Sequence, residues 1–389
     1  MHVALARGLM SGGDALSPAW GEVSAPVYPR GLSALIALLA YPMGLAKAGL
    51  VASGLAYVIF FLGVRATLRH FTDAHRAGIA ALLLLLVAKS PQRFYGFGAN
   101  PTTLAIGFSL LALQATLDRP GPTERRSAFI GALLLLAAVA THPIGAVVGM
   151  TAIGAVALAT RRSLRHVWLR GLFAILLPSV ALLGLVSRFG PHVSAREAAW
   201  ILDYQKTQES VLRGPAWTFP FSAITALPRA TGDLFTVLVA AAALPSLLTR
   251  PGRERLVRAW LALAAVGALL SFGGRLPAGG LLIYQDRFVP AMVLALAPLI
   301  LLTAGEALQK ARRAEIAVAI LLFGLAIVRH VGWVQKQQPI ATAADVQMIE
   351  WIERHVPRGA TIDGAYGDAT QWVPALAGIA VTHPHTHIS

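Results

Sequence analysis

The sequence predicts an all-α polytopic membrane protein with about ten transmembrane helices. Of its 389 residues, 56% are hydrophobic and only 13% are charged, and the mean hydropathy is +0.64. A water-soluble domain of this length does not carry so much apolar sequence. The apolar runs, such as residues 80–87 and 292–302, are also long and unbroken, whereas the strands of a membrane barrel alternate with period two. The spans are therefore expected to be helices.

The first half of the chain holds six of the expected spans and the second half holds four. They lie at residues 48–64, 77–88, 101–117, 127–141, 144–160, 171–187, 233–248, 257–274, 288–304 and 314–330. The segment 77–88 is short for a bilayer, so it is either a half-helix or a helix extended by its polar ends.

The distribution of basic residues predicts the orientation of these helices. Loops of one parity carry 17 Lys and Arg residues, and loops of the other parity carry 10. Because cytoplasmic loops are enriched in Lys and Arg, the first set is expected inside. The outer face then receives residues 1–47, the loops 188–232 and 275–287, and the C-terminal tail. The net charge of +15 follows from short basic clusters between spans, a pattern typical of membrane topology and not of a nucleic-acid surface.

Three regions are expected along the chain. Residues 1–47 form an outer segment in which the apolar run 31–46 is an interfacial helix; the alternative is an ordinary span with a reversed topology. Residues 48–330 form the transmembrane domain. Residues 331–389 are expected to form a small outer α/β segment, in the order helix, strand, helix, that is cut short at its end. In its first helix the apolar face is expected to include Val346, Ile349, either Trp351 or Ile352, and Val356.

Several motifs resemble the GT-C superfamily of polytopic membrane glycosyltransferases, in particular its uncharacterised actinobacterial-type members. The motifs follow one another over most of the chain: "HVALARGL", "YPRGL", "FGANPTTLAIGFSLLALQATL", "RRSAFIGALLLLAAVATHPIGAVVG", "IYQDRFVPAMVLALAPL", "MIEWIERHVPRGATI" and "YGDATQWVPALAG". The resemblance implies transfer of a sugar from a polyprenyl-phosphate donor to a glycan, lipid or protein acceptor, at the outer face of a bacterial plasma membrane.

The catalytic acid of that superfamily usually lies in the first outer loop, just after the first transmembrane helix. This chain departs from the pattern, because it starts at or just past that point. We therefore expect the first helix and its acid to lie upstream, and Asp14 and Glu22 to be the acids that remain in this loop.

Transfer from a lipid-linked sugar phosphate needs a base for the acceptor hydroxyl and donors or cations for the departing phosphate. Asp286 and Arg287, which follow Tyr284 at the mouth of a span, form the best pair, since the planar guanidinium suits phosphate. The alternative is a salt bridge or an interfacial anchor. The other substrate-binding candidates are Lys89, Arg93, Asn100 and His142.

Each of these candidates also has a structural interpretation. Asn100 before Pro101 is favoured as a helix cap, His142 before Pro143 is equally a turn residue, and Lys89 and Arg93 are equally interfacial anchors. The terminal "THPHTH" lacks a partner acid, so no metal or other cofactor site is expected, and the need for a divalent ion stays open.

Two other classes of protein compete with the enzyme. A transporter or lipid flippase usually places ionisable groups near the midplane, whereas the spans here offer little beyond Gln114. A non-catalytic membrane protein that keeps the GT-C fold is the second alternative.

Overall fold

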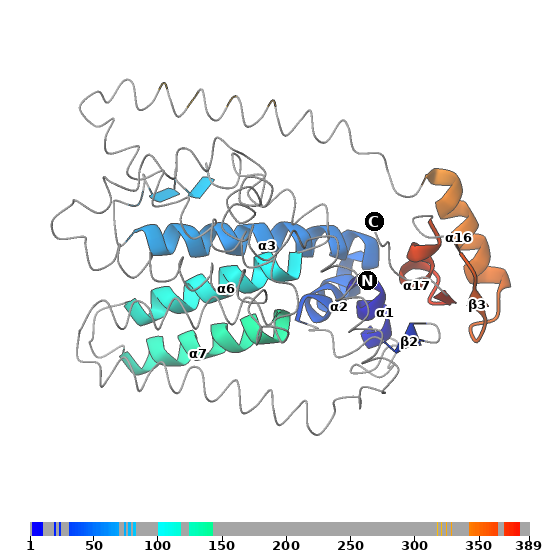
Figure 1. Cartoon of the computed structure of the whole chain (residues 1–389), viewed down its shortest axis with the longest axis horizontal. Helices are drawn as coiled ribbons and strands as arrows, with labels where there is room; N and C mark the ends of the chain where they lie inside the picture. Colours follow the sequence, from blue (N-terminus) through cyan, green and yellow to red (C-terminus); the bar gives the residue numbers. More distant parts are fainter. Residues whose placement is uncertain are drawn as a thin grey trace, which may run out of the picture. The chain divides into compact units, whose positions relative to one another are not determined.

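The structure is a computed structural model, and Figure 1 shows its described parts in colour. It describes residues 2–10, 19–20, 23–24, 31–69, 100–117, 124–142, 342–364 and 369–381, together with isolated positions between 74 and 82 and between 317 and 328. Contacts divide the chain into two units. One comprises Met1–Leu55, Leu182–Tyr204 and Trp333–Ser389, and the other comprises Ala56–Ala181 and Gln205–Gly332. The expected spans at 144–160, 171–187, 233–248, 257–274 and 288–304 lie outside the described residues.

The N-terminal part contains two short helices and a hairpin of two-residue strands. Helix α1 spans His2–Met10, strand β1 spans Ala19–Trp20, strand β2 spans Val23–Ser24, and helix α2 spans Gly31–Met43. The strands are antiparallel. Gly44 then ends α2 with a φ of +79°, a backbone conformation that favours glycine, and its N–H donates to the Ala40 carbonyl at 2.8 Å. The expected run 31–46 is thus a helix of its own, too short at 13 residues to cross a bilayer.

Helix α3 spans Leu45–Leu68 and coincides with the first expected transmembrane helix. Its 24 residues extend over about 36 Å, which exceeds the hydrocarbon thickness of a bilayer. Within the described residues it is the one helix long and apolar enough to cross a membrane. Leu50, Val58 and Leu62 are exposed on it, as a helix that faces lipid would require.

Helices α6 and α7 form an antiparallel hairpin. Helix α6 spans Asn100–Leu117 and α7 spans Glu124–Thr141, so both coincide with expected spans. Gly131, early in α7, lies against Ala112 and Ala115, late in α6, and a Cβ at Gly131 would meet the Ala115 Cβ at 3.6 Å. In Figure 1 the two helices run side by side. Most of α6 is buried, whereas α7 exposes Phe129, Ile130, Leu133 and Leu136.

Two glycines bring α3 and α6 into backbone contact. A Cβ added to Gly107 would lie 2.8 Å from the Phe60 backbone nitrogen and 2.9 Å from the Ile59 carbonyl carbon. A Cβ added to Gly63 would lie 2.7 Å from the Gly107 carbonyl oxygen and 3.0 Å from the Leu110 Cβ. Phe60 meets Gly107, whereas Gly63, later in α3, also meets Leu110, later in α6, so the two helices run parallel through the contact. Small residues permit such close approach between membrane helices.

The C-terminal segment is the helix and strand unit that the sequence predicts. Helix α16 spans Ala343–His355, β3 spans Thr361–Ile362, the 3₁₀ helix η5 spans Ala369–Trp372, α17 spans Val373–Leu376, and β4 spans Ala380–Val381. The two strands pair in parallel. The core of this segment consists of Ile349, Ile352, Val373, Ala377, Ile379 and Val381. The expected face of α16 is correct at Ile349, and Ile352 is the buried member of the alternative pair. Val346 is exposed, contrary to expectation.

The start of α16 gives a prediction of pH dependence. The Thr342 N–H donates to Asp345 Oδ2 at 2.7 Å, the Thr342 hydroxyl donates to the same oxygen at 2.8 Å, and the Asp345 N–H donates back to Thr342 Oγ1 at 3.3 Å. The bond from the Thr342 backbone, followed by the bond from its hydroxyl, lowers the pKa of Asp345 below its ordinary value. A carboxyl whose pKa is depressed by folding stabilises the folded state above its unfolded pKa, and that contribution is lost as the pH falls through the folded pKa.

We therefore expect α16 to become less protected against hydrogen exchange when the pH is lowered below the ordinary titration range of aspartate. The Thr342→Ala variant removes the hydroxyl and should lower protection at neutral pH roughly fivefold, the usual effect of losing such a cap. Protection factors measured by mass spectrometry on the peptide 342–356 test this. An unchanged protection factor in the variant would show that packing of Ile349 and Ile352 alone holds the helix.

Candidate functional site

Most of the site residues expected from the sequence lie outside the described residues. This applies to Asp14, Glu22, Lys89, Arg93, Tyr284, Asp286 and Arg287, whose roles stay predictions. Asn100 and His142 are the two candidates that the structure places.

Asn100 and His142 lie at the same end of the α6–α7 hairpin. Asn100 is the first residue of α6, with Pro101 next, where a missing N–H is tolerated. Helix α7 ends at Thr141, and His142 follows directly. Because the two helices are antiparallel neighbours of equal length, the start of the first meets the end of the second. Residues separated by 42 positions in sequence are thus brought to one polar end of an apolar hairpin.

His142 is buried at this end. Its exposed fraction is 5%, and its backbone N–H donates to the Ala138 carbonyl at 2.8 Å, which continues the hydrogen bonding of α7. A buried imidazole has little access to bulk water, so the hydrogen bonds that it makes are stronger than those on a surface. The two sequence interpretations of His142, a turn residue and a hydrogen-bonding group for a ligand, both stay predictions.

The hydroxyl of Thr102 is a polar group near Asn100 that sequence reasoning missed. Its Oγ1 is buried and makes no hydrogen bond within the described part of the chain. The hydroxyls of Thr67 and Thr141, in contrast, donate to the carbonyls of Gly63 and Ala137 at 2.9 and 2.7 Å. Thr102 stands in the first turn of α6, where the carbonyl four residues earlier precedes the helix. The "NPTT" run was the available signal, since threonine in a first helical turn lacks that acceptor.

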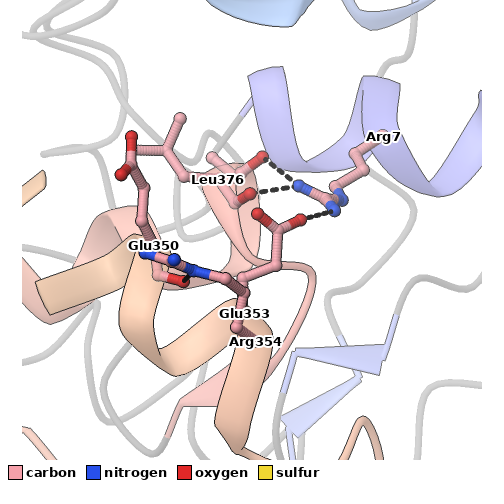
Figure 2. A network of polar contacts seen from close by, with 6 residues as sticks. Arg7, Glu350, Glu353, Arg354 and Leu376 are labelled. Atoms are coloured by element: carbon pink, nitrogen blue, oxygen red, sulfur yellow. Dashed lines mark hydrogen bonds and ion pairs between the residues drawn. The ribbon is translucent and has the colours of Figure 1, made fainter. Parts of the chain in front are cut away.

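A second polar cluster joins α1 to the C-terminal segment (Figure 2). Arg7 Nη2 lies 2.7 Å from Glu353 Oε1 of α16. Arg7 Nη1 donates to the carbonyl of Leu376 and lies 3.5 Å from that of Ala375, both in α17. Arg354, beside Glu353, donates within α16 to the Glu350 carbonyl at 3.1 Å. No local pattern in the sequence could indicate contacts between residues 346 or more positions apart.

Metal ligands do not cluster among the described residues. No group of three or more His, Asp or Glu side chains there is arranged to hold an ion. A requirement for a divalent metal stays untested.

A structural comparison finds two solved proteins that are similar to this chain. The first is the archaeal oligosaccharyltransferase AglB from Archaeoglobus fulgidus, solved with an inhibitory peptide and a dolichol-phosphate. It is 13% identical, with a TM-score of 0.57 over 98% of this chain and 59% of AglB. The second is ArnT from Cupriavidus metallidurans in the apo state, 15% identical, with a TM-score of 0.47 over 98% of this chain and 79% of ArnT.

Sequence comparison adds no relative, since neither a protein-family model nor a curated protein matches the chain. The chain spans about three fifths of the length of AglB. At this identity the likeness concerns the fold alone, and the membership of the GT-C superfamily that the motifs imply stays an expectation.

Proposed function

We propose that this protein is a membrane glycosyltransferase that moves a sugar from a polyprenyl-phosphate donor to a glycan, lipid or protein acceptor. The observation that carries the proposal is the fold likeness over 98% of the chain to AglB, which was solved with a dolichol-phosphate and a peptide. The motifs of the sequence point to the same class.

The reaction belongs at the outer face of a bacterial plasma membrane. The charge distribution supports this face, because the loops with 17 basic residues are expected in the cytoplasm and the carboxylates Asp14, Glu22 and Asp286 then lie outside. One such carboxylate removes the proton of the acceptor hydroxyl. Cations and hydrogen-bond donors stabilise the negative charge on the departing lipid phosphate.

Polar groups near Asn100 are suited to binding the phosphate and sugar oxygens of the polyprenyl-phosphate sugar. The N-terminus of α6 presents backbone N–H groups and the positive end of the helix dipole. The buried His142 follows the adjoining end of α7, and the Thr102 hydroxyl, which has no hydrogen-bond partner within the described residues, lies in the first turn of α6. These groups support a role in binding substrate, alongside Lys89, Arg93, Tyr284 and Arg287.

A transfer assay in membrane vesicles tests the function. We expect vesicles with the full-length protein to transfer labelled sugar from a polyprenyl-phosphate sugar, and to leave a nucleotide sugar unused. Vesicles without the protein are the control. Movement of the labelled lipid across the bilayer without a new glycosidic bond would instead identify a flippase, and the absence of both activities would favour a non-catalytic protein.

A further inference from the structure

We infer that Arg7 is a positioning residue that fixes the N-terminal outer segment on the C-terminal segment. Sugar transfer then requires that the two segments are held together. The inference rests on the proposed function and extends it to a residue that does not touch the donor. Its basis is the double contact of one guanidinium with α16 and α17.

The contact completes the end of α17. The N–H groups of Ala377 and Gly378 both return to the Val373 carbonyl, at 2.8 and 3.1 Å. This arrangement leaves the carbonyls of Ala375 and Leu376 at the helix end, where the helix dipole is negative. Arg7, which lies 369 positions before Leu376 in sequence, supplies hydrogen-bond donors for these carbonyls and also a positive charge.

Gly378 makes room for this side chain. Its φ of +73° is a conformation that favours glycine, and a Cβ at this position would lie 2.9 Å from Arg7 Nε. The same glycine therefore shapes the end of α17 and admits the guanidinium.

Two apolar residues of α1 are buried, in a helix that packs mainly against α2 and also contacts α17. Leu5 and Ala6, beside Arg7, are 1% and 0% exposed. The side chain of Arg7 is 27% exposed and that of Glu353 is 45% exposed, so the ion pair alone contributes little in water. The bonds to the helix carbonyls make the larger contribution to the contact with the C-terminal segment.

The consequence for the site comes from the short connection between α1 and the first outer carboxylates. Helix α1 ends at Met10, and Asp14 follows four residues later, with Glu22 beyond. Fixing α1 limits the positions that this stretch of chain can reach. Loss of the contact should therefore lower the rate of transfer without weakening the binding of the donor.

A labelling experiment measures the docking separately from transfer. The chain has no cysteine, so Ala6→Cys introduces a single, fully buried thiol. With Arg7 present, we expect slow reaction with a polar maleimide. In the Arg7→Gln background we expect about tenfold faster labelling, because charge-assisted hydrogen bonds of typical strength are lost. If Ala6→Cys alone already reacts quickly, Ala375→Cys, which is 2% exposed, serves as the probe.

The transfer arm compares Arg7→Gln with Arg354→Gln, each without the probe. Arg354→Gln removes the same charge from an exposed arginine of α16 that bonds within its own helix. We expect kcat to fall about tenfold in Arg7→Gln, with KM for the polyprenyl-phosphate sugar unchanged, and neither to change in Arg354→Gln.

Two results would overturn the inference: labelling that is no faster in Arg7→Gln, or faster labelling with an unchanged kcat. A wild-type protein that transfers no sugar would overturn the proposed function instead, while the labelling contrast would still test the docking of α1.

Discussion

Replacing Gly107 by valine should prevent the protein from folding stably in a membrane or detergent. The first carbon of the new side chain would lie 2.8 to 2.9 Å from backbone atoms of Ile59 and Phe60. Backbone atoms in the middle of a helix cannot rotate away, so α3 and α6 would have to separate. Forcing extra carbons into a packed contact costs about 1 to 3 kcal/mol or more, and here the buried Phe60 would lose its packing as well.

The measurement is the fraction of monodisperse protein recovered in detergent, together with its Tm. Gly54→Ala is the matched control, since Gly54 also lies in α3 and a Cβ there would meet nothing within 4 Å. That change should leave the Tm unchanged or slightly higher, because alanine favours helix. A Gly107→Val protein that is as monodisperse and as stable as the control would show that the close contact of the two helices is dispensable.

Among the described membrane-domain helices, the positions of α3, α6 and α7 follow from the sequence, but their contacts do not. The apolar runs gave α3, α6 and α7 within a few residues, because a membrane helix needs a long stretch without charges. Gly63 and Gly107, however, stand among many glycines, and nothing local distinguishes those that meet another helix. Contact between helices depends on which faces meet, and apolar helices carry little periodic signal.

The C-terminal segment shows the same limit on a smaller scale. The helical pattern of α16 predicts a buried face at Ile349 and leaves Trp351 and Ile352 as alternatives. Ile352 is buried and Trp351 is 51% exposed, because Val373 and Ile379, which are distant in sequence, form the other side of the core. The contact of Arg7 with α17 was beyond prediction for the same reason, since the two elements lie at opposite ends of the chain.

In the candidate site, too, some residues could be placed from local sequence and others could not. Asn100 and His142 could be brought together from sequence, because a short connection between two apolar helices implies an antiparallel hairpin. For Thr102 the "NPTT" run indicates a threonine in a first helical turn, but the burial that leaves its hydroxyl without a hydrogen-bond partner among the described residues depends on packing and has no local signal. The carboxylates depend on loops whose course no periodicity encodes.

The Arg287→Lys variant should bind the polyprenyl-phosphate sugar more weakly, with little loss of thermal stability. Arg287 follows Asp286 at the start of the expected span 288–304, at the depth of a lipid phosphate. A guanidinium binds two phosphate oxygens in a fixed plane, whereas an ammonium acts as a point charge. We expect KM for the polyprenyl-phosphate sugar to rise roughly tenfold, the usual scale for losing one charge-assisted hydrogen bond. Transfer measured against donor concentration, with Tm measured in parallel, tests this.

Arg126→Lys is the matched control for Arg287→Lys, because Arg126 is an exposed arginine near the start of α7 that is expected on the cytoplasmic side. Its donor curve should equal that of the wild type. If the Arg287→Lys curve is also unchanged, Arg287 is an interfacial anchor, because lysine and arginine both extend to the membrane surface with their stems in the apolar layer. The phosphate would then be held by other cations, and Lys89 and Arg93, which precede the α6 terminus, would be the next pair to replace.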